Sequence, residues 1–373
     1  MLIVGLSAAG ALIFIWLGYA FLIRIAGAVR AAPGLDESLC LPSVSVILAT
    51  RDESATISNR VADLLKSDYP EELLRVVVAL DSTREPSHPS LYTFPAERVR
   101  VVDGDLPGGK SATLNAGVRA ATSDVLVFAD AAQTFHPDAI RMLVSALARP
   151  RVGAVSGMLD IPAAAGSRLN LPQIYWRFER WLRKWEARAH SCVGVTGAIY
   201  AMPRRLWEPL PPNLILDDVY VPMRLALQGF RIDFEPRAQA TDVRRFVPAQ
   251  EYRRKVRTLT GVIQVCAWLP GVLNPARNPL WLPFVFHKLL RLLTPYLALL
   301  AVLGIAWSVV SLLLSLPGGV EALLSALVLV GILCLVPRVR RVLMGQLEWG
   351  LALQSSTVVA TVNGLRGRWD VWR

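Results

Sequence analysis

Two long stretches of the chain contain apolar residues and no charged side chain. The first covers residues 2–23 and ends at Arg24, and the second covers residues 292–316 and ends before Pro317. A helix of about 20 apolar residues crosses the hydrocarbon layer of a membrane. Both stretches therefore predict transmembrane helices. The first, within residues 1–30, is expected to be a retained anchor, because its apolar core is too long for a cleaved signal peptide.

The apolar pattern continues toward the C-terminus. Residues 322–336 with their flanks are long enough to return across the membrane, and the arginines at 338, 340 and 341 favour a cytoplasmic exit. Residues 281–341 are therefore predicted to form a transmembrane hairpin. Residues 342–373 are apolar but interrupted by polar side chains, which predicts an interfacial or re-entrant segment rather than a further crossing.

Residues 31–280 show short apolar runs that alternate with amphipathic stretches. Runs of strand length, rich in β-branched residues, occupy 43–49, 75–80, 99–102 and 125–129. Helical periodicity is present over 54–66, 111–121 and 137–148, with Pro137 expected at the first helical position. Strands that alternate with helices predict an α/β domain with a mostly parallel sheet, covered by helices on both faces.

Residues 171–190 form an aromatic and basic stretch of a different character. Ile174, Phe178, Trp181 and Trp185 recur at helical spacing, and arginine and lysine side chains occupy the opposite side. Such a helix is suited to the headgroup region of a membrane. The alternative is a helix packed on the domain core. The two acidic residues of this stretch, Glu179 and Glu186, are expected to be exposed.

The charge of the chain is strongly positive, with 40 Lys and Arg against 29 Asp and Glu, a net charge of +11. The basic residues gather beside the apolar runs, as the positive-inside rule requires, and no zinc-finger or RNA-recognition pattern is present. We therefore expect a membrane partner and no nucleic acid. The four cysteines show no Cys-x-x-Cys spacing, so they are interpreted as reduced, mostly buried thiols.

Carboxylates recur where the predicted strands end, at Asp52, Asp81, Asp103, Asp105 and Asp130. A single aspartate at such a position is typical of a turn or a helix cap. Ligands of parallel sheets, however, bind at the carboxyl ends of the strands. Several carboxylates at one edge therefore predict an anionic site for a metal ion or for ribose hydroxyls.

Two further segments carry candidate chemistry. Residues 108–111, Gly-Gly-Lys-Ser, open a predicted helix, where free backbone N–H groups and the Lys110 ammonium are suited to a phosphate. The alternative is a glycine turn with an exposed lysine. Asp217 and Asp218 lie at the start of a helical stretch over 218–228, a position that is typical of a helix cap.

Motifs in the region 42–257 resemble the membrane-integrated family-2 glycosyltransferases, which include cellulose, hyaluronan and poly-N-acetylglucosamine synthases. In order, they are PSVSVILATRDE, VVVALDSTRE, GGKSATLNAG, VLVFADAAQTFHPDAI, VGAVSG, VTGAIYAMPRRL, LDDVYVPMRLALQGFRIDFEP and YRRKVRTLTG. The resemblance implies a cytosolic GT-A domain, Rossmann-like with a mostly parallel sheet, between N-terminal and C-terminal transmembrane helices.

The resemblance also implies roles on the donor side. Asp81 is expected to contact the base or ribose of the nucleotide, and Lys110 to lie in the nucleotide pocket. Asp130 matches the first aspartate of the family's Asp-x-Asp motif, which holds Mg²⁺ or Mn²⁺ against the diphosphate. Ala132 occupies the position of the second aspartate. A hard cation needs few protein carboxylates when phosphates and waters complete its shell.

On the acceptor side, Asp217 and Asp218 match the acidic pair in which the second residue is the general base. Arg254 and Arg257 lie where the processive synthases carry Gln-x-x-Arg-Trp. Arg254 takes the position of the Gln and is expected to help bind the nucleotide sugar, and Arg257 keeps the Arg and is expected to meet the diphosphate. The alternative for this basic run is contact with lipid headgroups. Thr258 stands in place of the tryptophan that stacks under the acceptor sugar. This replacement favours a short product over a long polymer.

The sequence therefore predicts an inverting glycosyltransferase of the inner membrane, multi-pass, with a cytoplasmic catalytic domain. Its donor is expected to be a nucleotide sugar, with UDP favoured, and its acceptor a lipid-linked or growing glycan. One alternative is a processive polysaccharide synthase, for which a homo-oligomer or an export partner supplies the channel. The other is a non-catalytic protein that keeps the GT-A fold for assembly or binding.

Overall fold

The computed structural model describes residues 1–30, 40–83, 91, 93–161, 171–242 and 248–370, and forms two compact units. The sheet unit comprises Leu22–Arg245, Gln264–Phe284 and Trp369–Arg373. The helical unit comprises Met1–Phe21, Phe246–Ile263 and Val285–Arg368. The domain boundary predicted at residue 31 lies outside the described residues, so it stays a prediction.

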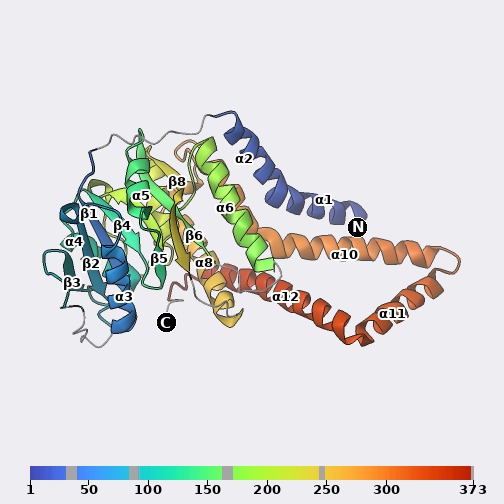
Figure 1. The fold of residues 1–373 in the computed structure, drawn as a ribbon. Coiled ribbons are helices and arrows are strands. Elements are labelled where there is room, and N and C mark those ends of the chain that lie inside the picture. Colours follow the sequence, from blue (N-terminus) through green and yellow to red (C-terminus); the bar gives the residue numbers. More distant parts are fainter. Residues whose placement is uncertain (31–39, 84–90, 92, 162–170, 243–247, 371–373) are drawn as a thin grey trace. The chain divides into compact units, whose positions relative to one another are not determined.

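An eight-stranded sheet forms the centre of the sheet unit (Figure 1), with the strand order β3-β2-β1-β4-β7-β6-β8-β5. The strands are β1 (Val44–Thr50), β2 (Leu74–Leu80), β3 (Val99–Asp103), β4 (Val125–Ala129), β5 (Gln133–Phe135), β6 (Val152–Asp160), β7 (Ile199–Pro203) and β8 (Arg231–Asp242). Strand pairs β1/β2, β1/β4, β2/β3 and β6/β8 are parallel, and β4/β7, β6/β7 and β5/β8 are antiparallel. The prediction of a mostly parallel sheet is confirmed.

Helices cover both faces of this sheet because side chains alternate along each strand. Val46 of β1 packs in one apolar cluster with Ile57 and Ile140, and its neighbour Ile47 packs in the other with Leu114 and Val221. The helices that supply these side chains are α3 (Ser54–Leu65) and α5 (Ala139–Leu147) for the first cluster, and α4 (Lys110–Ala120) and α7 (Asp217–Leu227) for the second.

The four strands and three helices predicted from the pattern match β1–β4 and α3–α5 to within two residues at each end. Three details differ. Pro137 precedes Asp138, which is the N-cap of α5, so it is not the first helical residue. Helix α7 begins at Asp217 rather than Asp218. Cys40 is exposed, whereas Cys192 is buried as expected.

The aromatic stretch forms α6 (Leu171–Ala189), which is only partly covered by the sheet unit. Leu182 and Glu186 are buried, at 0% and 1% exposed. The expectation that Glu186 is exposed was therefore wrong. Ile174 is 51% exposed and Trp181 36%, so one side of the helix stays open. Helix α6 thus combines a packed side with a side on which Ile174 and Trp181 are exposed.

The end of α2 (Tyr19–Ala28) packs against α6 within the sheet unit. A Cβ atom on Gly27 would lie 2.9 Å from the Trp185 ring, and Arg188 donates from Nη2 to the carbonyl oxygen of Arg30 at 3.1 Å. The guanidinium of Arg24 lies 5.9 Å from the centre of the same tryptophan ring. The first apolar helix is therefore joined to α6 by direct contacts.

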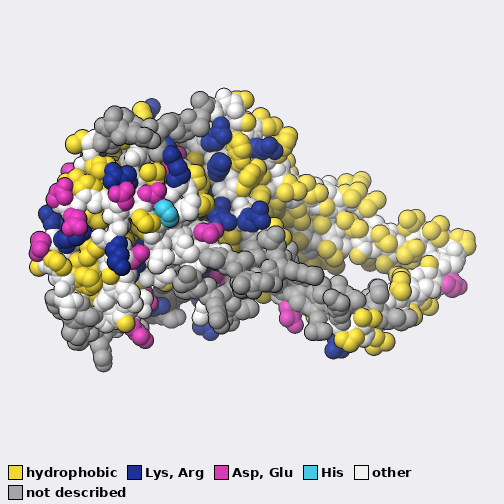
Figure 2. All heavy atoms as spheres, in the orientation of Figure 1, with side chains coloured by type: hydrophobic (Ala, Val, Ile, Leu, Met, Phe, Trp, Pro, Cys, Tyr) yellow, Lys and Arg dark blue, Asp and Glu magenta, His cyan; other side chains and the backbone are white. Residues whose placement is uncertain are grey.

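The remaining helices are α1 (Leu2–Ile13), α8 (Pro248–Trp268), α9 (Trp281–Phe284), α10 (Thr294–Ser315), α11 (Gly319–Leu335) and α12 (Pro337–Leu365). Continuous helices over Leu2–Ala28 and Trp281–Ser315 are long and apolar enough to cross a membrane. Hydrophobic side chains cover α1 and α10 in Figure 2. Whether α11 crosses, and whether α12 lies at the interface, stay predictions.

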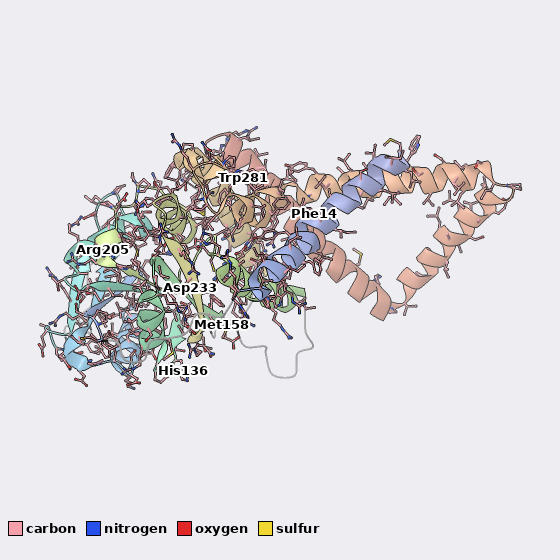
Figure 3. The ribbon with its side chains drawn as sticks, turned by 90° about the horizontal axis from the view of Figure 1, so that it is seen from above. Phe14, His136, Met158, Arg205, Asp233 and Trp281 are labelled. Carbon is pink, nitrogen blue, oxygen red and sulfur yellow. The ribbon has the colours of Figure 1, made fainter. Side chains whose placement is uncertain are left out.

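Helices α1 and α10 lie side by side in the helical unit (Figures 1 and 3) and meet at two glycines. A Cβ atom on Gly304 would lie 2.8 Å from the Cα of Gly5. Nearer the sheet unit in sequence, Trp16 donates from Nε1 to Oγ1 of Thr294 at 3.2 Å. Phe14, labelled in Figure 3, contacts the ring of Phe286 edge-on, with 5.6 Å between ring centres.

We expect Gly304→Leu to destabilise the helical unit by about 1–3 kcal/mol, because the new side chain must displace the backbone of α1. Thermal unfolding of the purified protein in lipid nanodiscs measures this loss. Gly10→Leu is the matched control, since a Cβ atom on Gly10 meets no atom within 4 Å in the part of the chain that the structure describes. Equal unfolding temperatures for the two variants would contradict a close helix crossing.

Candidate functional site

The parallel strands β1, β2 and β4 end at one edge of the sheet, where the candidate residues gather. Strand β1 pairs with β2 on one side and with β4 on the other, so Asp81 and Asp130 follow neighbouring parallel strands. Helices α4 and α7 begin at Lys110 and Asp217, and both cover the same face of the sheet. The fold therefore brings together segments that lie more than 100 residues apart.

Lys110 and Asp217 form an ion pair at this edge. The Nζ atom of Lys110 lies 3.2 Å from Oδ2 of Asp217, and the two side chains are 26% and 7% exposed. Burial alone lowers the pKa of Lys110, but the carboxylates of Asp217, Asp130 and Asp218 outweigh this effect and raise its pKa above the ordinary value. The Lys110 ammonium thus lies among three carboxylates. Lys110, Asp130, Asp217 and Asp218 are called the acidic cluster below.

Gly197 lies between Lys110 and Asp218. A Cβ atom on Gly197 would be 3.6 Å from Nζ of Lys110 and 3.6 Å from Cβ of Asp218. The same segment contacts the start of α7, because the backbone N–H of Val195 donates to the carbonyl oxygen of Asp218 at 2.9 Å. Asp217 and Asp218 lie in the first helical turn, where the helix dipole stabilises a negative charge.

Asp81 closes a turn with the glycine segment. Its Oδ1 accepts hydrogen bonds from the backbone N–H of Thr83 at 3.1 Å and from that of Gly109 at 3.2 Å. Partial burial raises the pKa of Asp81, but these bonds outweigh burial and lower its pKa below the ordinary value. The ionised carboxylate therefore stabilises the turn above the ordinary pKa, and this contribution is lost as the pH falls through the lowered value.

Gly108 makes the close approach to Asp81 possible. Both Gly108 and Gly109 have a φ of +88°, which favours glycine. A Cβ atom on Gly108 would clash with Cγ2 of Thr83 and lie 2.9 Å from Oδ1 of Asp81, whereas one on Gly109 meets no atom of the described residues within 4 Å. The two glycines share a backbone conformation but differ in their surroundings.

The backbone of Asp130 accepts a hydrogen bond from Arg60, a residue that the sequence analysis missed. Arg60 of α3 is 2% exposed and donates from Nε to the backbone oxygen of Asp130 at 3.2 Å. It also pairs with Asp63 and lies over the Phe135 ring, 4.2 Å from the ring centre. Burial lowers the pKa of Arg60 to about 10, against the opposing effect of Asp63. The sequence did offer one sign of this role, because Arg60 lies on the apolar side of the predicted helix, where a charged residue is unusual.

Two other strand-end carboxylates, Asp52 and Asp105, make local contacts. Asp52 is exposed and accepts a hydrogen bond from Oγ1 of Thr50 at 2.9 Å. Asp105 pairs with Arg119 at 2.5 Å, with both side chains well exposed. These contacts match the turn interpretation rather than a shared site.

Arg254 and Arg257 lie on α8 in the helical unit. Nη1 of Arg254 lies 3.3 Å from Oε1 of Glu251, one turn earlier on the same helix. Their assignment to the nucleotide sugar and its diphosphate stays a prediction. Asp81, Lys110, Asp130, Asp217 and Asp218 are the predicted residues that the sheet unit brings together.

Few side chains at this edge of the sheet could bind a metal ion. Within the described ranges, no three His, Cys, Asp or Glu side chains form a group that could hold a metal ion. Asp130 provides one carboxylate, and Ala132 provides no donor atom. One carboxylate suits a hard cation that takes its remaining ligands from phosphates and water.

Comparison with known proteins places this site in a family. The model of "Glycosyltransferase like family 2" matches residues 42–261. Poly-beta-1,6-N-acetyl-D-glucosamine synthase of Staphylococcus epidermidis is 23% identical over 201 residues, 52% of this chain and 48% of that protein. The probable glycosyltransferase YdaM of Bacillus subtilis is 25% identical over 211 residues, 53% of this chain and 50% of that protein. The chain spans about half the length of these curated relatives.

A solved structure shares the fold along nearly the whole chain. The mannosyltransferase PcManGT from Pyrobaculum calidifontis, in complex with GDP-Man and Mn²⁺, aligns with a TM-score of 0.73 and 21% identity. The alignment covers 98% of this chain and 99% of that one, which confirms the expected GT-A fold. Since the family match covers more than half of the chain and includes every residue of the acidic cluster, the chain belongs to glycosyltransferase family 2.

Proposed function

We propose that the protein is an inverting glycosyltransferase that moves a sugar from a nucleotide-sugar donor to a lipid-linked or growing glycan at a membrane. The observation that carries this proposal is the cluster of Lys110, Asp217 and Asp218 around Gly197, beside the strand end that bears Asp130. It offers a carboxylate base and a cationic group on the same side of a GT-A sheet.

Asp218 is the proposed base. Its carboxylate takes the proton of the acceptor hydroxyl, whose oxygen forms a bond to the anomeric carbon of the donor sugar. The bond from that carbon to the diphosphate oxygen breaks, its electron pair leaves with the nucleoside diphosphate, and the anomeric configuration inverts. Asp217 holds Lys110, 3.2 Å away, and so fixes the ammonium beside the base.

The nucleotide is proposed to bind at the Asp81 turn. Asp81 faces the base or the ribose, and Lys110 with the start of α4 faces the phosphates, because a helix N-terminus and an ammonium both attract anions. Arg254 is proposed to help bind the nucleotide sugar, and Arg257 to meet the departing diphosphate, since a guanidinium binds phosphate oxygens bidentately. A uridine nucleotide is favoured. GDP-mannose is a second candidate because PcManGT binds it.

The residues at this edge of the sheet fit a divalent cation that takes one ligand from the protein. Asp130 would hold Mg²⁺ or Mn²⁺, and Arg60 fixes the backbone of Asp130 from behind. When bound, the cation neutralises charge on the diphosphate. Because the cation would neutralise this charge, we expect metal to increase the rate of transfer. Lys110 contributes a second positive charge at the same edge of the sheet.

The location is proposed to be the inner membrane, with the catalytic domain in the cytoplasm. Helix α6 is proposed to lie at the membrane surface, because the end of the apolar helix Leu2–Ala28 contacts it through Gly27, and Ile174 and Trp181 of α6 are exposed. Quenching of tryptophan fluorescence by brominated lipids tests this position. Trp181→Phe should remove part of the quenching, and an unchanged quenching curve would contradict the proposal.

The product is proposed to be short, because Thr258 provides no aromatic ring for an acceptor sugar. A processive synthase is the alternative, with an oligomer or an export partner supplying the channel. Product length on a gel separates the two: a ladder of long chains would favour the synthase.

Release of nucleoside diphosphate by the purified full chain in nanodiscs tests the proposed function. The donors are UDP-glucose, UDP-N-acetylglucosamine, UDP-galactose and GDP-mannose, each with Mg²⁺, Mn²⁺ or EDTA and with a lipid extract as acceptor. Release with one sugar supports the proposal and identifies the donor. Absence of release with every donor would favour the non-catalytic assembly or binding protein.

We expect Gly108→Ala to raise the KM for the donor by about tenfold, because a Cβ atom there displaces the Asp81 carboxylate from the turn. Gly109→Ala is the matched control. It introduces the same positive-φ strain of about 1–2 kcal/mol without a clash. Donor titrations with both variants measure the difference. Equal KM values would show that the position of Asp81 does not matter for donor binding.

A further inference from the structure

Tyr200 of β7 has a buried hydroxyl that makes no hydrogen bond to any of the described residues. The residue is 1% exposed, and its hydroxyl oxygen is inaccessible to solvent. A buried hydroxyl that makes no hydrogen bond costs free energy, so the Tyr200 hydroxyl is a candidate donor for a group that changes position when substrate binds. The sequence analysis did not single out this tyrosine.

The ring of Tyr200 is fixed on the face of the sheet that α4 and α7 cover. It stacks on Phe128 of the neighbouring strand β4, with 4.4 Å between ring centres and 9° between ring planes. Phe128 in turn stacks on Trp207 at 5.2 Å. The three aromatic rings hold the hydroxyl in one place, in the cluster that also contains Val221 of α7.

Geometry brings this tyrosine near the start of α7: Tyr200 shares an apolar cluster with Val221 of α7, and the segment that leads into β7 contacts Asp218 through the backbone N–H of Val195 at 2.9 Å. Burial raises the pKa of Tyr200, and the carboxylates of Asp217, Asp218 and Asp130 raise it further, whereas Arg224 lowers it. Lys110 of α4 contributes the neighbouring positive charge through its pair with Asp217. The phenol therefore stays protonated and is available only as a hydrogen-bond donor toward carboxylates.

We propose that Tyr200 is a positioning residue for the general base, and that its hydroxyl donates a hydrogen bond to the Asp218 carboxylate when the donor is bound. This inference rests on the proposed function. A hydrogen bond from a neutral donor favours the ionised carboxylate and turns its other oxygen toward the acceptor. Catalytic hydrogen bonds are often open in the free enzyme and close in the substrate complex.

Tyr200→Phe tests this role, because phenylalanine keeps the ring and its stacking on Phe128. We expect kcat to fall about tenfold, the usual effect of one hydrogen bond to a charged group. The KM for the donor should change less than about twofold, since the hydroxyl acts on the base. The acid limb of the kcat profile should move to higher pH by about 0.5–1 pH unit, because Asp218 loses a donor that favours ionisation. The unfolding temperature should not fall.

Tyr69→Phe is the matched control. Tyr69 is 5% exposed, and its hydroxyl donates to the carbonyl oxygen of Pro42 at 2.6 Å, in the other apolar cluster. This variant should lower the unfolding temperature and leave kcat unchanged, the opposite pattern. An unchanged kcat in Tyr200→Phe would overturn the proposal. A lower kcat with an unmoved acid limb would overturn it too. Wild-type protein without transferase activity would instead contradict the proposed function.

Discussion

Asp218→Asn should lower kcat by about 10²- to 10⁴-fold, the contribution that a positioned general base makes to a proton transfer. The amide cannot accept the proton of the acceptor hydroxyl, but it fills the same space at the start of α7. We therefore expect the KM for the donor and the unfolding temperature to change little. Release of nucleoside diphosphate at saturating donor and acceptor measures the effect.

Asp68→Asn is the control for this variant. Asp68 is an exposed carboxylate that pairs with Arg141 at 3.3 Å, and it lies before β2, at the opposite edge of the sheet. Its replacement should leave kcat at the wild-type value. An Asp218→Asn protein with wild-type turnover would show that another group removes the proton.

Lys110→Met should destabilise the sheet unit by about 3 kcal/mol. Asp217 is 7% exposed, and removal of one partner from a buried pair leaves the other charge without compensation. The value is taken at the lower end of the range for such pairs, because Lys110 itself is 26% exposed. We also expect transfer to be lost, since the ammonium is the proposed phosphate contact. Chemical denaturation in detergent measures the stability.

Two further variants isolate the pair. Arg119→Met removes the other ion-paired cation of α4, whose pair with Asp105 is well exposed, and it should lower the stability much less than Lys110→Met does. Lys110→Met combined with Asp217→Asn should recover most of the lost stability, because the buried negative charge is gone. Equal losses for Lys110→Met and Arg119→Met would contradict a buried pair.

The pH dependence of Lys110→Met follows from the raised pKa of Lys110. In the wild-type protein the charged amine contributes its full stability below the ordinary pKa of 10.5, and this contribution disappears as the pH rises through the higher folded value. The stability difference between wild type and variant should therefore be constant from about pH 6 to about pH 9, and shrink only in strong alkali.

The parallel half of the sheet could be predicted from the sequence because its strands are continuous apolar runs. β4 (Val125–Ala129) has five apolar residues in a row, and its predicted bounds match those of the structure. β8 (Arg231–Asp242) could not be found in this way. Polar residues interrupt its apolar residues, so it forms no continuous apolar run. One of them is Asp233, labelled in Figure 3, which is 2% exposed and pairs with Arg149 at 2.7 Å.

The candidate site was predictable where a residue type repeats at strand and helix ends. Asp81, Asp130 and Asp218 were found in that way, and Lys110 through its glycine turn. Tyr200 was not, because a tyrosine within an apolar strand has no feature that marks its hydroxyl as unpaired. Arg60 was missed for a related reason: its role depends on the backbone of Asp130, 70 residues away.

The contacts of the N-terminal helix have consequences for the order of events during synthesis. Arg30 and its partner Arg188 are 158 residues apart, whereas Trp16 and Thr294 are separated by 278. At about 5–20 residues per second, a ribosome needs roughly 15–55 s to bridge the longer interval. The end of this helix can therefore dock on α6 while α10 is still unmade. In this order the contact of Arg30 forms before that of Trp16, although Trp16 is synthesised first.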